Sequence, residues 1–263
     1  MPTPRPYPSW VVASSPWTWP AAWVELAAAV ALAGSYTLAA RRYRPARWRV
    51  ACFAGAIALL LALSLTPLGT LAMHYLLWAH LIQNVALAEW IPLLLVASIP
   101  PGLAATATRF GAVRFLTRPF VALPLWLGGY LVWHIPAAYD AALEQHALLH
   151  LEHLTYLVTG VLLWWCVLQS QPWSLSSGGK AVYLFAAFVF ASPLGLLLAL
   201  LPSPIYHFYI HAPRLWGLSP LADQQLAGIA MAVSESVVFF SMFTVFFVRF
   251  MAEEAAEAEQ PGG

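Results

Sequence analysis

Residues 133–153 read WHIPAAYDAALEQHALLHLEH, and this polar stretch lies between two strongly apolar segments. A polar segment in that position is expected at a membrane surface, between two membrane-spanning helices. It holds four of the eight histidines of the chain. His146, His150 and His153 are spaced by four and three residues, which places their imidazoles along one side of a helix. The carboxylates in the stretch are those of Asp140, Glu144 and Glu152.

The composition around this stretch is that of a membrane protein with several spans. Of the 263 residues, 61% are hydrophobic and 9% are charged, whereas a soluble domain carries about 25% charged residues. The mean hydropathy is +0.73, and the 13 tryptophans suit the interfacial belts of a lipid bilayer. A formal net charge of +1 gives no reason to expect nucleic acid as a partner. We therefore expect the bilayer itself to surround this chain.

The cysteines and the first residues add no competing signal. Cys52 and Cys166 lie far apart and form no CxxC or CxC motif, so neither a disulfide framework nor a thiolate metal site is predicted. Residues 1–20 are rich in Pro and Trp and lack a basic start followed by an apolar run, so we expect no cleaved signal peptide. The first apolar segment is instead predicted to be an uncleaved anchor.

Seven apolar segments approach the length of about 20 residues that crosses a hydrocarbon core. The fourth contains Pro124 and Gly128–Gly129, which predict a kink within it. No internal repeat or domain boundary is visible, so the sequence predicts an all-α, polytopic bundle in a single transmembrane domain, residues 1–263. The predicted spans lie near residues 20–40, 50–66, 74–98, 119–134, 149–169, 181–201 and 223–250, with a tail at 251–263.

The basic residues predict the orientation of this seven-helix bundle. Cytoplasmic loops of membrane proteins carry an excess of Lys and Arg. With seven spans, only Arg5 and Arg214 fall on one side, which is then the outside. The N-terminus is predicted to be outside and the C-terminus cytoplasmic, with the acidic residues 253–263 as a frayed end. The basic residues on the cytoplasmic side are Arg41, Arg42, Arg44, Arg47, Arg49, Arg109, Arg114, Arg118, Lys180 and Arg249.

The same topology places all eight histidines at or near the outer face. His74 and His80 fall at the outer end of the third span, and His207 and His211 in the sixth connection. Neutral imidazole is a common ligand for copper, zinc and iron, so this asymmetry predicts a metal site assembled from several helices. Interfacial anchoring of the imidazoles and a pH-sensing role are the alternatives.

Two other spans offer polar groups to such a site. His80 and Asn84 are four residues apart on one helical face, although an amide there also suits helix–helix association. The last span begins at Asp223, and Met231 on it offers a thioether suited to Cu(I). Further along, Glu235 is predicted near mid-membrane, about 18 Å below Asp223 at about 1.5 Å per residue. Glu25 lies near the outer end of the first span, within reach of the histidine layer.

Three blocks of this sequence resemble the CtaG family of cytochrome c oxidase assembly factors, which are seven-span proteins of the bacterial plasma membrane. MHYLLWAHLIQNVALAEWIPLLLVASIPP, residues 73–101, is similar to the segment that carries the family's H-x-x-Q-H motif. WHIPAAYDAALEQHALLHLEHLTYLVTGVLLWW, residues 133–165, resembles its central block. LADQQLAGIAM, residues 221–231, resembles its D-Q-Q-x-x-G-x-x-M block. Together the ordered blocks cover most of the chain, from residue 73 to 231.

The resemblance implies a non-enzymatic role in maturing the oxidase, with delivery or insertion of copper at the outer face and oxidase subunits as partners. His80, His134, His150 and His153 match family histidines, and Asp223, Gln224 and Gln225 match the polar block. One position departs from the pattern, because Asn84 stands where the H-x-x-Q-H motif has its second histidine. His146 and Met231 are the residues that could compensate for it. The candidate metal ligands are His80, His134, His146, His150, His153, Asp223 and Met231.

Two other classes of function fit the same residues. An intramembrane zinc hydrolase could hold Zn²⁺ through His80, His150 and His153, with Glu152 or Asp223 as general base. The sequence contains no HExxH motif, and Glu152 is predicted on a different helical face from its neighbouring histidines. A haem-binding electron carrier could use His80 and His153 on facing helices as axial ligands.

Overall fold

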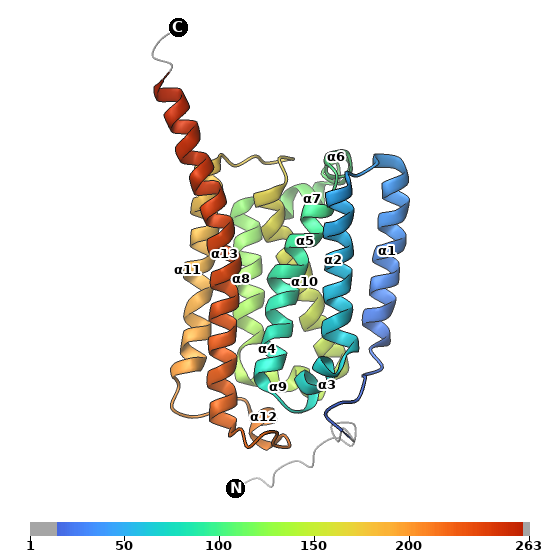
Figure 1. The fold of residues 1–263 in the computed structure, drawn as a ribbon, viewed down its shortest axis with the longest axis vertical. Helices are drawn as coiled ribbons and strands as arrows, with labels where there is room; N and C mark the ends of the chain where they lie inside the picture. The colour runs from blue at the N-terminus through green and yellow to red at the C-terminus, as the bar shows by residue number, and fades with distance from the viewer. Residues whose placement is uncertain (1–14, 260–263) are drawn as a thin grey trace.

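A computed structural model describes residues 15–259 of the chain, and all regular structure in that part is helical (Figure 1). The helices stand side by side, with short connections at both ends of the bundle. The elements are α1 (Trp23–Tyr43), α2 (Arg47–Leu65), α3 (Pro67–His74), α4 (Leu77–Val85), the π-helix η2 (Ala86–Trp90), α5 (Ile91–Ser98), α6 (Pro101–Ala107), α7 (Gly111–Leu116), α8 (Pro119–Trp133), α9 (Pro136–Glu144), α10 (His146–Leu168), α11 (Ser177–Leu200), α12 (His207–His211) and α13 (Pro220–Ala258).

Six of these helical runs are long and apolar enough to cross a membrane by themselves. They are α1, α2, the continuous run α4–η2–α5, α10, α11 and α13. The pair α8 and α9 passes the same test together but is bent by 75°. The chain is therefore a multi-pass helical membrane protein with six spans, or seven when the bent pair forms one.

The break in this bent pair does not lie where the sequence predicts it. Pro124 sits inside α8, which runs unbroken past Gly128–Gly129 to Trp133. The chain turns instead at His134 and Ile135, and Ile135 has the extended conformation with φ −63° and ψ 126°. The physical reason is Pro136, because a proline ring disfavours the helical conformation of the residue before it. The turn leaves His134 at the junction of two helices.

The third predicted span also begins later than predicted. His74 ends the short helix α3, Tyr75 and Leu76 break the helix, and α4 starts at Leu77. His74 therefore belongs to a separate helix and not to the third span. The span continues through the π-helix η2, which carries Glu89. Single π turns inside α-helices widen the local helix and occur often at functional sites.

Close approaches at glycines fix how the helices pack. A Cβ atom added to Gly228 of α13 would lie 2.5 Å from the backbone oxygen of Gly195 on α11, so the two backbones are nearly in contact there. A Cβ on Gly160 of α10 would collide with the backbone oxygen of Ala88 in η2. Small residues at helix interfaces allow such packing in membranes. Gly160 thereby sets α10 directly against the third span, whose start carries His80.

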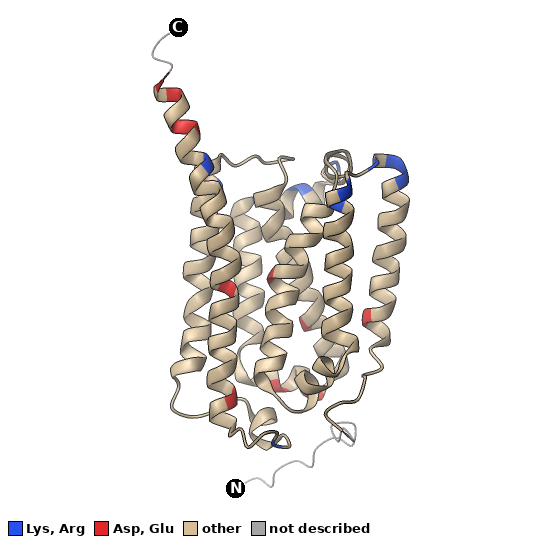
Figure 2. Cartoon of the chain, viewed as in Figure 1, with Lys and Arg blue, Asp and Glu red and all other residues tan. Residues whose placement is uncertain are grey.

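The two ends of the bundle differ in charge (Figure 2). Lys and Arg gather at the end where α1 turns into α2 and where α6 and α7 lie. The segments that carry the histidines lie at the opposite end: α3, α12, the junction of α8 and α9, and the first turns of α4 and α10. Of the two basic residues assigned to the histidine end, Arg214 lies there, donating to the backbone oxygen of Tyr209 in α12, and Arg5 is outside the described residues.

The last helix is longer than the sequence suggests. The prediction ends the span at residue 250 and treats the acidic tail as frayed, but α13 continues to Ala258. Alanine and glutamate are strong helix formers, so the residues beyond Phe250 extend the helix past the rest of the bundle. The last residues of the predicted tail, 260–263, are outside the described part.

Candidate metal centre

A buried group of two histidines and one glutamate lies at the histidine end of the bundle. His80 comes from α4, and Glu152 and His153 come from α10. One ligand atom of each side chain lies within 4.8 Å of the corresponding atoms of the other two. His80 has no exposed surface and Glu152 is 1% exposed, whereas His153 is only partly buried. We call these three residues the inner cluster.

Glu152 is a member that the sequence reading missed. Its position beside His153 predicts a face about 100° away from that histidine, yet the structure brings both side chains to His80. The reason is the packing of α10, which is covered on two sides so that neighbouring positions both face protein. The prediction that Glu152 lies apart from its neighbouring histidines is therefore wrong.

The hydrogen bonds of His80 determine which of its nitrogens can bind a ligand. The hydroxyl of Tyr209 donates to the backbone oxygen of Ala72, so its single proton is already used. The same hydroxyl lies 3.0 Å from Nδ1 of His80 and must accept there, which places the ring proton on Nδ1. Nε2 of His80 then carries a lone pair, and this buried atom has no hydrogen-bond partner.

His134 is arranged in the same way beside the inner cluster. Its Nδ1 lies 2.7 Å from the backbone oxygen of Tyr130, which can only accept, so the proton again sits on Nδ1. Its Nε2 is buried and without a hydrogen-bond partner, as is Nε2 of His153. The ring of Tyr139 lies close to the rings of both His134 and His80, with centroid distances of 6.1 and 5.2 Å. The Tyr139 hydroxyl also lacks a partner.

Tyr206, between α11 and α12, holds the backbone at His134. Its hydroxyl donates to the His134 carbonyl oxygen over 3.1 Å. Burial, with a smaller contribution from the carboxylates of Asp140 and Glu152, raises the pKa of Tyr206. The hydroxyl therefore stays protonated and keeps this bond throughout the physiological pH range.

Asn84 makes a specific contact where the H-x-x-Q-H pattern has a histidine. It is 1% exposed, and its Nδ2 donates to Oε1 of Glu152 over 3.0 Å. One helical turn beyond His80, it therefore orients the carboxylate of the inner cluster. At the position where the family pattern has a histidine, this chain therefore has a hydrogen-bond donor to Glu152.

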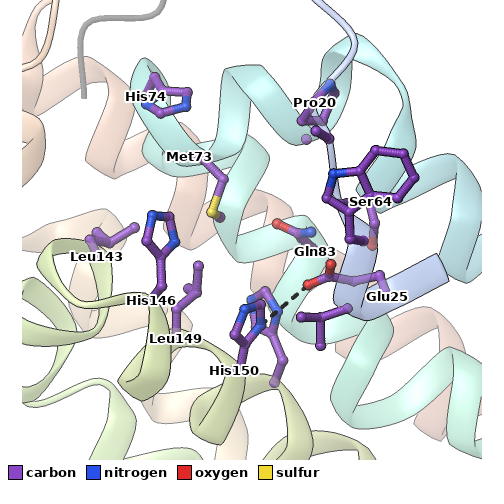
Figure 3. Close-up of a pocket in the computed structure, with 16 residues that line it drawn as sticks. Pro20, Glu25, Ser64, Met73, His74, Gln83, Leu143, His146, Leu149 and His150 are labelled. Carbon is purple, nitrogen blue, oxygen red and sulfur yellow. Dashed lines mark ion pairs between the residues drawn. The ribbon is translucent and has the colours of Figure 1, made fainter. Parts of the chain in front are cut away.

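His146 and His150 are not brought to the inner cluster. Both line a cavity beside the first turn of α10, together with His74 and His153 (Figure 3). Nδ1 of His150 forms an ion pair with Oε1 of Glu25 on α1 at 3.5 Å. The expectation that Glu25 reaches the histidine layer is confirmed. The three histidines predicted to lie along one side of α10 therefore do not form one site. His146 and His150 line the cavity only, whereas His153 lines the cavity and also belongs to the inner cluster.

Asp223 and Met231 lie outside the inner cluster. The two carboxylate oxygens of Asp223 accept from the backbone amides of Leu77 and Trp78, at 2.9 and 3.1 Å. Asp223 thus caps the start of α4 and stabilises the helix that carries His80. Met231 is fully buried in the apolar core along α13. In this arrangement Asp223 supports the inner cluster only indirectly, through the start of α4.

Two further acids lie within the spans, deeper in the bundle. Glu235 on α13 accepts from the hydroxyl of Tyr130 on α8. Glu89 in η2 is fully buried, and neither of its carboxylate oxygens has a hydrogen-bond partner. Tyr130 connects this region to the metal centre, because its carbonyl oxygen holds His134.

The fold and this site define a class: a multi-pass helical membrane protein with a buried histidine–carboxylate cluster at one end of its bundle. Residues 32–253 match the model of the family described as cytochrome c oxidase caa3 assembly factor, Caa3_CtaG. The match covers most of the chain, and the protein belongs to this family of oxidase assembly factors. No curated protein and no solved structure matches it.

Proposed function

We propose that this protein binds copper as cargo for the assembly of cytochrome c oxidase, and that the inner cluster with His134 is where the ion is held. The family supplies the role in oxidase assembly. The identity of the cargo rests on the chemistry of the donors. Imidazole nitrogens suit copper well, and a carboxylate can complete the set.

The observation that carries the proposal is the set of unpartnered nitrogens. Buried polar atoms in proteins nearly always have hydrogen-bond partners. Here Nε2 of His80, His134 and His153 lack one, and the hydrogen bonds of His80 and His134 leave a lone pair on each Nε2. Histidines that bind metals typically donate their other ring N–H to a carbonyl, a carboxylate or water, which fixes the ring. The arrangement at His134 has that form, and a tyrosine hydroxyl replaces the usual acceptor at His80.

The charge of the inner cluster also suits a cation. Glu152 lies beside the imidazoles of His80 and His153 and the amide of Asn84, and no Lys or Arg side chain is within ion-pair distance of it among the described residues. A bound cation would compensate a buried carboxylate, which is otherwise costly in a membrane. The orientation with this end outside is part of the proposal, since the basic residues gather at the opposite end.

The test is to purify the protein in detergent, load it anaerobically with Cu(I), and measure bound metal and the optical spectrum. We expect one retained copper in the wild type, and none in the double variant His80→Ala and His153→Ala. The matched control is the double variant His207→Ala and His211→Ala, which removes two exposed histidines of α12 and should keep the copper. Undiminished copper in the first variant would overturn the proposal.

A second candidate is zinc hydrolysis, because two histidines and one glutamate are a known ligand set of catalytic zinc. The assembly-factor family favours a non-catalytic role. The same purification separates the candidates: zinc retained together with peptide or lipid hydrolysis supports the enzyme. A Soret band supports the haem-binding alternative.

A further inference from the structure

A cavity of about 320 Å³ lies outside the inner cluster, between the first turn of α1, helix α3 and the first turns of α10 (Figure 3). The cavity is more exposed than the inner cluster, and its lining includes a methionine, which the inner cluster lacks. His153 lines it and is also the only partly exposed member of that cluster. The side chains in its lining that offer a nitrogen, sulfur or carboxylate oxygen as a possible metal ligand are those of Glu25, Met73, His74, His146, His150 and His153.

Met73 gives this cavity a donor that the inner cluster lacks. Its sulfur atom points into the cavity, toward the space between His146 and Gln83 (Figure 3). His146 and His150 face the same space from successive turns of α10. A thioether combined with imidazoles is a soft donor set that favours Cu(I) over hard cations such as Mg²⁺ or Ca²⁺.

Glu25 prepares His150 for the same chemistry. A carboxylate close to one ring nitrogen favours the other nitrogen as the ligand atom. Oε1 of Glu25 lies 3.5 Å from Nδ1 of His150, and this ion pair joins α1 to α10 across the cavity. The side chains are 17% and 36% exposed, so ions from the medium reach this pair directly.

We propose that the cavity is a second Cu(I) site, an entry site formed by Met73, His146 and His150, from which the ion passes to the inner cluster through His153. The inference rests on the proposed function, because the inner cluster is the destination. The transfer is an exchange of ligands: each bond to a nitrogen of the inner cluster replaces one to a donor of the cavity. The ion stays Cu(I) throughout, so no oxidant or reductant takes part.

The experiment follows loading by stopped flow, with purified full-length protein removing Cu(I) from a weak chromogenic Cu(I) chelator. Met73→Leu keeps the size of the side chain and removes the sulfur. It should slow loading by about tenfold or more, remove the copper–sulfur signal from X-ray absorption of partly loaded protein, and leave the final copper content at the wild-type value. Met242→Leu, a partly buried methionine of α13 outside the cavity, is the matched control and should change none of these.

Glu25→Gln provides a second variant on another helix. It keeps the shape of the side chain, weakens the hold on His150, and should also slow loading without lowering the final copper content. Loading of Met73→Leu at the wild-type rate would overturn the entry site, as would a loss of final copper equal to that in the double variant His80→Ala and His153→Ala. The proposed function fails separately, when that double variant keeps its copper.

Discussion

The histidines at the start of α10 stand in two different surroundings. His153 reaches a buried cluster in which nearby tyrosine groups fix the rings of His80 and His134. His146 and His150 face an open cavity, where Oε1 of Glu25 lies 3.5 Å from Nδ1 of His150. All three share the regular spacing that singles them out in the sequence. Burial and the partner of the second ring nitrogen, rather than spacing, therefore distinguish the proposed retaining site from the proposed entry site.

The largest expected difference between the two places is in equilibrium affinity for Cu(I). His153→Ala should lower it by more than about a hundredfold, since even residues that only orient a metal ligand change affinity by 10- to 100-fold. His146→Ala should leave it close to the wild-type value, because the inner cluster stays complete. Competition with a Cu(I) chelator of known affinity measures both. An equal loss of Cu(I) affinity in the two variants would mean that the cavity and the inner cluster form a single site.

A smaller effect is expected from the group that orients His80. Tyr209→Phe removes the acceptor for its Nδ1–H and should lower Cu(I) affinity by about 10- to 100-fold. The same competition assay measures it. Tyr183→Phe removes the hydroxyl of another buried tyrosine, on α11, and serves as the control. An unchanged affinity in Tyr209→Phe would mean that the tautomer of His80 is not fixed by this contact.

The contact of Asn84 with Glu152 should contribute less. Asn84→Ala removes one donor to the carboxylate and is expected to cost about tenfold in Cu(I) affinity, the low end for such partners. Asn84→His restores a ring N–H at the position where the family has histidine, and its affinity should stay near that of the wild type. If both variants lose affinity equally, the amide has a role that an imidazole cannot replace.

The smallest perturbation tests only which side of the membrane the cavity and the inner cluster face. Gln145→Cys puts a thiol on the exposed turn before α10, and Ser174→Cys puts one on the exposed turn before α11, at the opposite end. With the proposed orientation, an impermeant thiol reagent labels the first in intact cells and the second only after lysis. The reverse pattern would place both sites on the cytoplasmic side. Copper affinity should not change in either variant.

The sequence predicts the spans well because long apolar runs leave few alternatives in a membrane. It fails at the breaks, which depend on local stereochemistry that several residues could supply. Pro124 and Pro136 are both prolines in apolar surroundings, but only the second ends a helix here. His74 is likewise separated from the third span by a break at Tyr75 and Leu76, which contain neither glycine nor proline.

The candidate metal centre is predicted in part, through its histidines. His80 and His153 are identified both by their sidedness and by the family resemblance, and the structure places them together. Glu152 is missed because one residue of separation predicts a different face, and only the packing around α10 brings it in. The contacts of Asp223 come from amides 146 and 145 residues away along the chain. No local sequence pattern indicates that a carboxylate in the last span will accept hydrogen bonds from the first amides of the third span.

Two carboxylates, those of Asp140 and Asp223, have a consequence for the motions of this end of the bundle. Asp140 accepts from the amides of His207 and Phe208, at 3.1 and 3.0 Å, as Asp223 does from those at the start of α4. First-turn amides of a helix usually have no partner inside the helix and exchange their hydrogens quickly. The two amides of each pair should exchange slowly, since they are released only when two distant segments separate. Their exchange rates would therefore report how often α12 leaves α9 and how often the start of α4 leaves α13.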